Sequence, residues 1–183
     1  MEKAKRKKIS ETIHLSEGIH AELEGERIKL KKGNDELISK IEYPVKIEGK
    51  KIIIECEKPR KKEKKMIKTT AAKIRNMVSG LNEKYKYKLQ ICAVHFPMNV
   101  AVHGNQIGIK NFLGEVKERK AKILPGVDVK IEKDIITIES HDKEKAGQTA
   151  ANIETATKVR KRDRRIFQDG IYITEKQKGA RRR

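Results

Sequence analysis

Basic side chains are concentrated near the end of the chain, on both sides of a short apolar segment. Lys or Arg occupies six of the eight positions from 158 to 165 and five of the eight from 176 to 183. Ile166-Phe167 and Ile171-Tyr172-Ile173 lie between the two clusters. Guanidinium and ammonium groups bind phosphate oxygens through charge-assisted hydrogen bonds. The clusters therefore predict a partner rich in phosphates, such as a nucleic acid.

Three interpretations of this C-terminal segment are open. The segment either packs against the folded body and binds RNA, or is a disordered basic tail that binds nucleic acid, or serves solubility alone. Charge runs are usually solvated surface, but the apolar residues give this segment a means of attachment. We expect a docked tail that carries cations.

No constellation of catalytic or metal-binding residues is evident. Cys56 and Cys92 are 36 residues apart, which is neither a zinc spacing nor a disulfide framework, and both are expected to be reduced core thiols. Gly104, Gly108 and Gly114 fit no phosphate-binding loop. The histidines have no ligand spacing: His14, His20, His95, His103 and His141. We expect no catalytic residue, no metal, no cofactor and no enzymatic activity.

The net charge of +19 over 183 residues is unevenly distributed. Residues 1–8, 58–68, 158–165 and 176–183 carry +4, +6, +5 and +5, so the remainder carries −1. A body of balanced charge folds without self-repulsion, and concentrated basic segments are typical of proteins that bind polyphosphates. Neither a secretion signal nor an apolar run near 18 residues is present, so a cytoplasmic protein without membrane contact is expected.

Short strands and one helix are predicted in the first half. Apolar residues alternate from Ile13 to Ile54 with turns near Gly25, Gly33 and Gly49, which is typical of antiparallel strands. After the basic run from Lys58, apolar residues from Met66 to Tyr85 recur in steps of three and four, which predicts a helix.

The same order of segments then repeats. Residues 21–30 match 100–109, residues 45–55 match 129–139 with seven identities in eleven, and TAAKI at 70–74 matches TAANI at 149–153. The offsets are 79, 84 and 79, so the second half has five extra residues, expected around 121–126, and a second helix near 146–159.

An α+β fold of two tandem duplicated domains follows from this repeat. Each domain has short antiparallel strands and one helix around a single core. The expected divisions are a basic leader at 1–8, a first domain at 9–86, a second domain at 87–175 and a basic tail at 176–183.

The duplicated half, the TAAKI and TAANI helices and RRIFQDGIYITEKQKG at 164–179 carry a resemblance to a known family. They are similar to the universal large-subunit ribosomal protein of the L-six family, in its archaeal and eukaryotic form, called L-nine in eukaryotes. The similarity covers about 9–179, nearly the whole chain. The different Pro/Tyr/Gly/Lys ending of the bacterial branch is absent.

The resemblance implies large-subunit rRNA as the partner, near the sarcin-ricin loop and the stalk base, with neighbouring ribosomal proteins and translational GTPases nearby. It implies tail docking by Phe167, Asp169, Gly170, Ile171 and Tyr172. The RNA contacts that it implies are Arg160, Lys161, Arg162, Arg164, Arg165, Lys176 and Lys178. Charge alone adds Lys158, Arg181, Arg182 and Arg183.

No helix-turn-helix or finger pattern is present, and three Phe and four Tyr are too few for an aromatic platform. Recognition of RNA shape through phosphates and sugars is therefore expected. The alternative, from another class, is a free-standing regulatory or RNA-chaperone protein.

Removal of 158–183 is expected to weaken RNA binding more than neutralisation of Lys61, Lys62, Lys64 and Lys65, because the tail holds more cations and a means of attachment. Titration of both variants against a large-subunit rRNA fragment measures the difference. Equal losses would contradict this prediction.

Overall fold

The computed structural model describes residues 8–94, 96–163 and 165–176, and the chain forms two compact units, Met1–Glu83 and Lys84–Arg183. Each unit has its own cluster of buried apolar residues. The α+β class with duplicated domains is thus confirmed. The division comes slightly before the expected one between 86 and 87, because the first strand of the second unit already begins at Tyr85.

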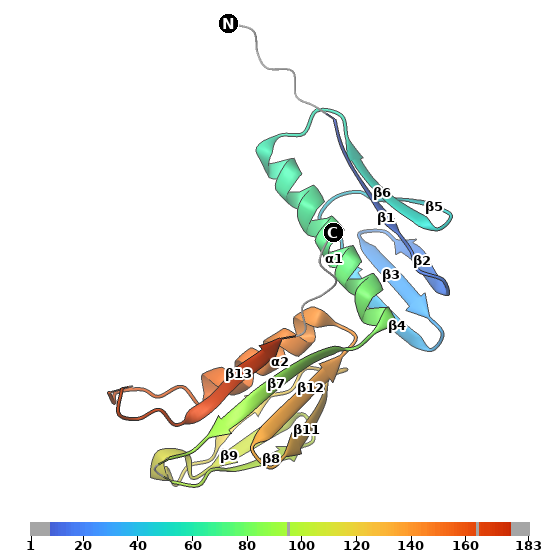
Figure 1. Cartoon of the computed structure of the whole chain (residues 1–183). Coiled ribbons are helices and arrows are strands. Elements are labelled where there is room, and N and C mark those ends of the chain that lie inside the picture. The colour runs from blue at the N-terminus through green and yellow to red at the C-terminus, as the bar shows by residue number, and fades with distance from the viewer. Residues whose placement is uncertain (1–7, 95, 164, 177–183) are drawn as a thin grey trace, which may run out of the picture. The chain divides into compact units, whose positions relative to one another are not determined.

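The described part of the first unit, residues 8–83, contains one helix and six strands, and the strands pair antiparallel (Figure 1). One sheet has the order β1-β6-β5 and the other β2-β3-β4. The elements are β1 (Ile9–His14), β2 (Ile19–Glu24), β3 (Arg27–Lys32), β4 (Asp35–Lys40), β5 (Lys46–Glu48), β6 (Lys51–Cys56) and α1 (Lys61–Asn82).

Helix α1 begins earlier and ends earlier than expected. Pro59 precedes it, and the Glu63 side chain accepts a hydrogen bond from the Arg60 backbone N–H at 2.6 Å, so the basic run forms its first turns. Ile67, Ala71 and Ile74 follow the expected apolar stripe and are fully buried. Tyr85 does not continue this stripe, because the backbone becomes extended at Glu83.

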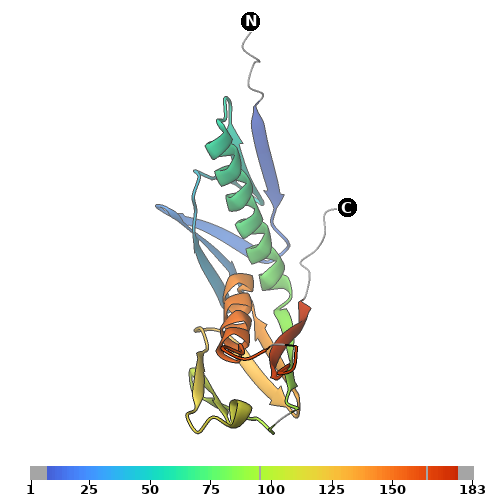
Figure 2. The same cartoon turned by 90° about the vertical axis from the view of Figure 1, so that its left-hand side faces the viewer.

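The second unit repeats this architecture and adds one strand. Its sheets have the orders β11-β12-β7-β13 and β10-β9-β8, and Figure 2 shows α2 against the larger sheet. The elements are β7 (Tyr85–Cys92), β8 (Asn99–His103), β9 (Gln106–Lys110), η1 (Phe112–Gly114), β10 (Arg119–Lys122), β11 (Asp128–Glu132), β12 (Ile135–Ser140), α2 (Lys143–Ala156) and β13 (Gly170–Lys176).

Equivalent residues in the two units follow from the strand registers. Leu30 and Ile109 are each buried in the middle strand of a three-stranded sheet, and the preceding hairpins turn at Gly25 and Gly104, both with φ +57°. A left-handed residue at this point matches the twist of a tight hairpin, and glycine adopts it without strain.

The five extra residues lie in two places. The paired positions Arg27 and Gln106 are 79 apart, Lys40 and Lys122 are 82 apart, and Ile47 and Ile131 are 84 apart. Three residues are therefore inserted between β9 and β10, where η1 forms, and two after β10. The expected position around 121–126 accounts only for the second insertion.

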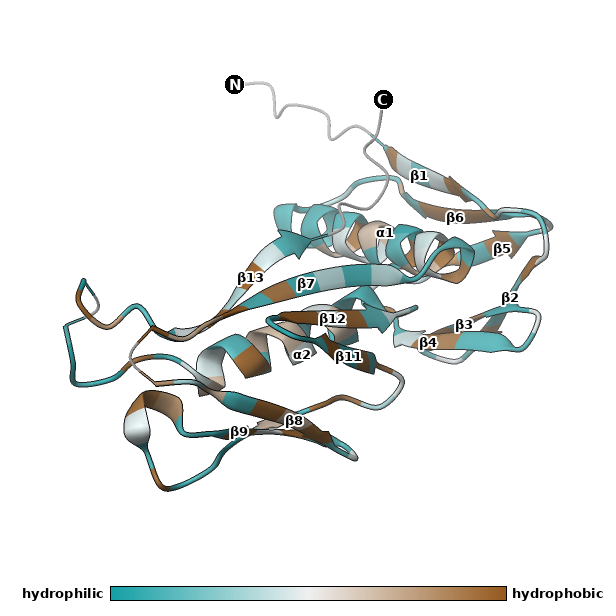
Figure 3. Cartoon of the chain, turned by 60° about the horizontal axis from the view of Figure 1, so that its bottom comes forward, coloured by the Kyte–Doolittle hydropathy of each residue, from teal (hydrophilic) through white to brown (hydrophobic). Residues whose placement is uncertain are grey.

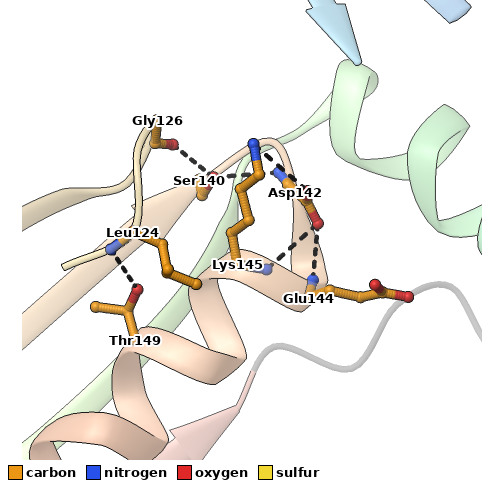
Figure 4. A network of polar contacts seen from close by, with 7 residues as sticks. All are labelled: Leu124, Gly126, Ser140, Asp142, Glu144, Lys145 and Thr149. Atoms are coloured by element: carbon orange, nitrogen blue, oxygen red, sulfur yellow. Dashed lines mark hydrogen bonds and ion pairs between the residues drawn. The ribbon is translucent and has the colours of Figure 1, made fainter. Parts of the chain in front are cut away.

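Helix α2 is bounded by polar contacts (Figure 4). The Asp142 carboxylate accepts hydrogen bonds from the backbone N–H groups of Glu144 and Lys145, and the Ser140 hydroxyl donates to the Gly126 carbonyl at 2.7 Å. The helix ends at Ala156 rather than near 159, because the Thr157 hydroxyl bonds the carbonyls of the last turn.

Cys56 and Cys92 are free, partly buried and in different units. In the described part of the chain, no helix has the length and apolar character needed to span a membrane.

The equivalent threonines of the two helices are predicted to respond oppositely to replacement by Val. Thr149 Oγ1 accepts a hydrogen bond from the Leu124 N–H at 3.3 Å, whereas Thr70 Oγ1 is buried without a hydrogen-bond partner among the described residues. Thr149→Val should destabilise the second unit by about 1 kcal/mol, and Thr70→Val should leave the first unit unchanged or up to about 1 kcal/mol more stable.

Hydrogen exchange measured peptide by peptide on the full chain reports each unit separately. The Thr→Ser change at each position keeps the hydroxyl and serves as control. Equal destabilisation by both Val variants would contradict the assignment.

Candidate nucleic-acid interface

The C-terminal residues attach to the second unit through β13. This strand pairs antiparallel with the β7 edge, with Ile171 opposite Ile91, and Figures 1 and 2 show the two strands side by side. The Ile171 side chain is fully buried in the core, and Ile173 N–H donates to a Glu154 carboxylate oxygen on α2 at 3.3 Å. Backbone pairing and apolar burial therefore hold the segment.

Asp169 fixes the entry into β13. The residue is 1% exposed, and its carboxylate accepts a hydrogen bond from the Val94 N–H at 2.7 Å. The Tyr172 hydroxyl donates to the Gln168 carbonyl at 3.1 Å, and its ring lies 3.0 Å from where a Cβ on Gly170 would stand. A larger residue at 170 would displace that ring. The expected docking residues, with partly buried Phe167, thus surround a single turn.

The chain is also held where α2 ends. The Thr157 hydroxyl accepts a hydrogen bond from Ile171 N–H at 2.9 Å, and Val159 is buried in the core. The described residues between Val159 and Phe167, 160–163 and 165–166, belong to a loop anchored at both ends, which Figure 1 shows extending from the second unit. Exposed cations of this loop are thereby held on a fixed base.

The cations of the loop fall into two groups. Arg162 lies over the Phe167 ring, 4.9 Å from its centroid, and Arg165 forms an ion pair with Asp163 at 3.1 Å. Arg160 and Lys161 of the loop, and Lys158 just before it, are exposed and have no ion pair within the ranges that the structure describes. These three are available to a ligand. Lys176 is exposed at the end of β13, whereas Arg164, Lys178, Arg181, Arg182 and Arg183 lie outside the described residues.

One of these cations borders a groove of about 830 Å³ between β10 and α2. The described residues that line it include no acid: Arg119, Lys120, Ala121, Lys122, Gln148, Asn152, Thr155, Ala156 and Arg160. Lys120, Lys122 and Arg160 are exposed, and none of them has an ion pair in the described part of the chain. The groove therefore presents three uncompensated cations together.

Lys120 and Lys122 were not among the predicted site residues. RKAK at 119–122 is a short basic segment with a single apolar residue, so its charge alone is unremarkable in this chain. Alternation along β10 buries Ala121 and exposes both lysines, which lie about 7 Å apart along the strand. Pairing with β9 and packing of α2 bring them beside Arg160.

Arg119 belongs to the wall of the groove. Its guanidinium donates to both Glu115 carboxylate oxygens at 2.8 and 2.6 Å and to the Ala156 carbonyl at the end of α2 at 2.8 Å. It also lies 4.1 Å from the centroid of the Phe112 ring. With these partners it joins the inserted η1 segment to α2. The Arg119 hydrogen bond lowers the pKa of the Glu115 carboxyl, although burial opposes it.

The side chains of the groove favour anions rather than metal ions. The described residues contain no group of three or more His, Cys, Asp or Glu side chains placed to hold an ion. The groove is lined by cations and amides, which favour anions. Binding of phosphate is the chemistry that its side chains can perform.

Comparison with known proteins gives consistent matches. The family model described as Ribosomal protein L6 matches residues 96–170, which include β8 to α2 and the basic loop. The chain is similar to Large ribosomal subunit protein uL6 of Methanococcus vannielii, with 43% identity over 171 residues, covering 92% of this chain and 94% of that protein. It is also 41% identical over 169 residues to Large ribosomal subunit protein uL6 of Ignicoccus hospitalis, covering 88% and 91%.

We predict that the Glu115–Arg119 pair makes the free energy of unfolding of this chain depend on pH in the acidic range. The pKa of Glu115 is lowered in the folded state from an ordinary value of 4.5. The ion pair therefore stabilises the folded state fully above pH 4.5, and this stabilisation is lost as the pH falls through the lower pKa of the folded state. Urea unfolding from pH 7 down to about pH 3 should therefore show a larger loss for the wild-type chain than for Glu115→Gln. Exposed Glu132, changed to Gln, is the control; identical pH profiles for wild type and Glu115→Gln would refute the coupling.

Proposed function

Since this chain belongs to the uL6 family of large-subunit ribosomal proteins, we propose that it is a structural constituent of the large ribosomal subunit and binds large-subunit rRNA through its second unit. The groove between β10 and α2 and the anchored basic loop form the proposed contact surface. The proposal involves no catalytic step and locates the protein in cytoplasmic ribosomes.

The observation that carries this proposal is the group of unpaired cations on a fixed frame. Lys120, Lys122 and Arg160 border one acid-free groove, and Lys158 and Lys161 extend the positive surface along the loop. Release of counterions from neutralised phosphates favours binding to such a surface. Because Val159, Phe167 and β13 hold the loop, little conformational entropy is lost when it binds.

Phosphates and sugars are the proposed points of contact, rather than bases. The aromatic rings beside the surface, Phe112 and Phe167, are already covered by Arg119 and Arg162. They are not open platforms for base stacking. Gln148 and Asn152, which are joined by a hydrogen bond of 2.9 Å, add amide groups that suit ribose hydroxyls and phosphate oxygens.

The finer proposal concerns the position in the subunit. The family resemblance of 164–179 supports binding near the sarcin-ricin loop and the stalk base, with other ribosomal proteins as neighbours and translational GTPases docking nearby. Arg164, Lys178 and Arg181 to Arg183 are proposed as further contacts on sequence and charge alone.

A free-standing RNA regulator or chaperone remains the alternative from another class. Sucrose-gradient sedimentation of a cell lysate separates the two functions. The ribosomal function requires the protein to sediment with large subunits, whereas a soluble pool with little subunit-bound protein would favour the alternative.

The groove is predicted to contribute directly to affinity. Combined Lys120→Gln, Lys122→Gln and Arg160→Gln changes should make the plot of log affinity against log salt less steep for a large-subunit rRNA transcript. The magnitude of its negative slope should decrease by about 2 to 3, because each lost phosphate contact removes about 0.7 to 0.9. Filter binding at several salt concentrations measures the slope.

A matched control removes the same charge elsewhere on the second unit, with Lys110, Lys130 and Lys133 changed to Gln. These side chains are exposed and do not line the groove. An equal change of slope in the control would show that net charge, rather than the groove, determines binding. Neutralisation is a cleaner test than deletion of 158–183, since deletion also removes the buried Ile171 and unfolds part of the core.

A further inference from the structure

Helix α1 of the first unit carries a second group of exposed cations. Lys61, Lys64, Lys65 and Lys68 are all exposed, and we call them the α1 lysine face. Figure 3 shows this N-terminal part of the helix as hydrophilic. The face spans about 10 Å along the helix, because each residue advances it by about 1.5 Å.

Helical geometry places these four lysines on one side. Steps of three and four residues relate them, so they form a single stripe. The buried residues Ile67, Ala71 and Ile74 form a separate stripe against the core, centred about 100° around the helix from the lysines. Thr69 and Ala72, which are exposed beside the lysines, are small, so a bulky ligand can approach the ammonium groups closely.

The α1 lysine face gathers four exposed cations, without an ion pair to any described residue, on one stripe of a helix. Six other cations of the unit form ion pairs with acids: Lys8–Glu55, Lys29–Glu36, Lys40–Glu26, Lys46–Glu55, Lys73–Glu42 and Arg75–Glu11. The four lysines of the face have no such partner within the described ranges. Glu63, the acid among them, accepts the hydrogen bond of the Arg60 N–H instead.

This arrangement opposes the stability of the helix. Positive charge near a helix N-terminus is unfavourable with the helix dipole, and like charges three and four residues apart repel. Residues placed only for solubility would be interspersed with acids, as in the rest of the unit. An anionic ligand on the face removes both penalties.

We propose that the α1 lysine face is a second rRNA-binding surface, which holds the phosphate backbone of an RNA segment different from the one in the groove of the second unit. This proposal rests on the function proposed above and extends it to two separate contacts, one from each unit. Two contacts on one chain increase the effective concentration of each for its RNA segment.

An RNA backbone fits the face better than an acidic protein does. Protein interfaces are depleted in Lys and are built on buried apolar or aromatic anchors. In the described part of the first unit, the large apolar side chains that are exposed are Leu23 and Ile38, and neither is on α1. Lysines without an apolar anchor suit phosphates, which bind through charge alone.

The test is a full-length variant with Lys61, Lys64, Lys65 and Lys68 changed to Gln. Its affinity for a large-subunit rRNA transcript should fall at least about tenfold near 0.1 M salt. The magnitude of the negative slope of log affinity against log salt should decrease by about 3. Its melting temperature should rise by a few degrees, on the order of 3 to 8 °C, because the repulsion is removed. A purely structural role for these lysines would not combine weaker binding with higher stability.

The matched control carries Lys40, Lys46, Lys50 and Lys51 changed to Gln, which removes the same charge from exposed positions of the same unit. An affinity of the face variant equal to that of the control would overturn the proposal.

Lysine acetylation followed by mass spectrometry gives a second readout on the wild-type chain. Protection of the four lysines by the transcript supports the proposal, whereas protection in assembled subunits but not by the transcript overturns it in favour of an acidic protein neighbour.

Failure of the inference is distinguishable from failure of the proposed function. A wild-type chain that does not bind the transcript contradicts both. Binding that depends on Lys120, Lys122 and Arg160 but not on the α1 lysine face contradicts only the second contact. Independent contacts also require the losses of log affinity in the two variants to add when they are combined.

Discussion

The pairing of β13 with β7 is the interaction on which the second unit depends. It completes the sheet on the edge that β7 would otherwise expose, and it buries Ile171 completely. Asp169 and Thr157 orient its entry through hydrogen bonds to Val94 and Ile171 backbone groups. A segment dense in like charges would not order itself, so apolar burial and backbone pairing must outweigh the repulsion among its cations.

The ion pairs and hydrogen bonds distinguish basic side chains that hold the fold together from basic side chains that are free to bind a ligand. Arg119 is fully engaged with Glu115, the end of α2 and Phe112, and therefore holds an inserted segment in place. Lys120 and Lys122, one and three residues further on, have no such partners among the described residues. Adjacent basic residues thus have different functions, which the number of their hydrogen bonds reveals better than their charge does.

The two units share one duplicated architecture but differ in the segments added to it. Both units pack one helix against two antiparallel sheets, with equivalent hairpins at Gly25 and Gly104. The second unit adds β13, which anchors the basic loop, and the η1 insertion, which Arg119 joins to the end of α2 beside the groove. The first unit keeps a longer helix, which extends three residues further at its N-terminus, including exposed Lys61 and Lys62, and five further at its C-terminus. A buried core tolerates few changes, so divergence is concentrated at element ends and edges.

The sequence by itself determined the fold class, the repeat and the attachment of the tail, because these depend on local periodicity and on the burial of residues such as Ile28, Ile107 and Ile171. Helix ends were mispredicted, since Tyr85 and Val159 keep the apolar period while the backbone becomes extended at Glu83 and the Thr157 hydroxyl closes α2. Only the tertiary structure decided which cations meet. Lys122 and Arg160 are far apart in sequence, and strand pairing with helix packing brings them to one groove, so no local pattern contains that information.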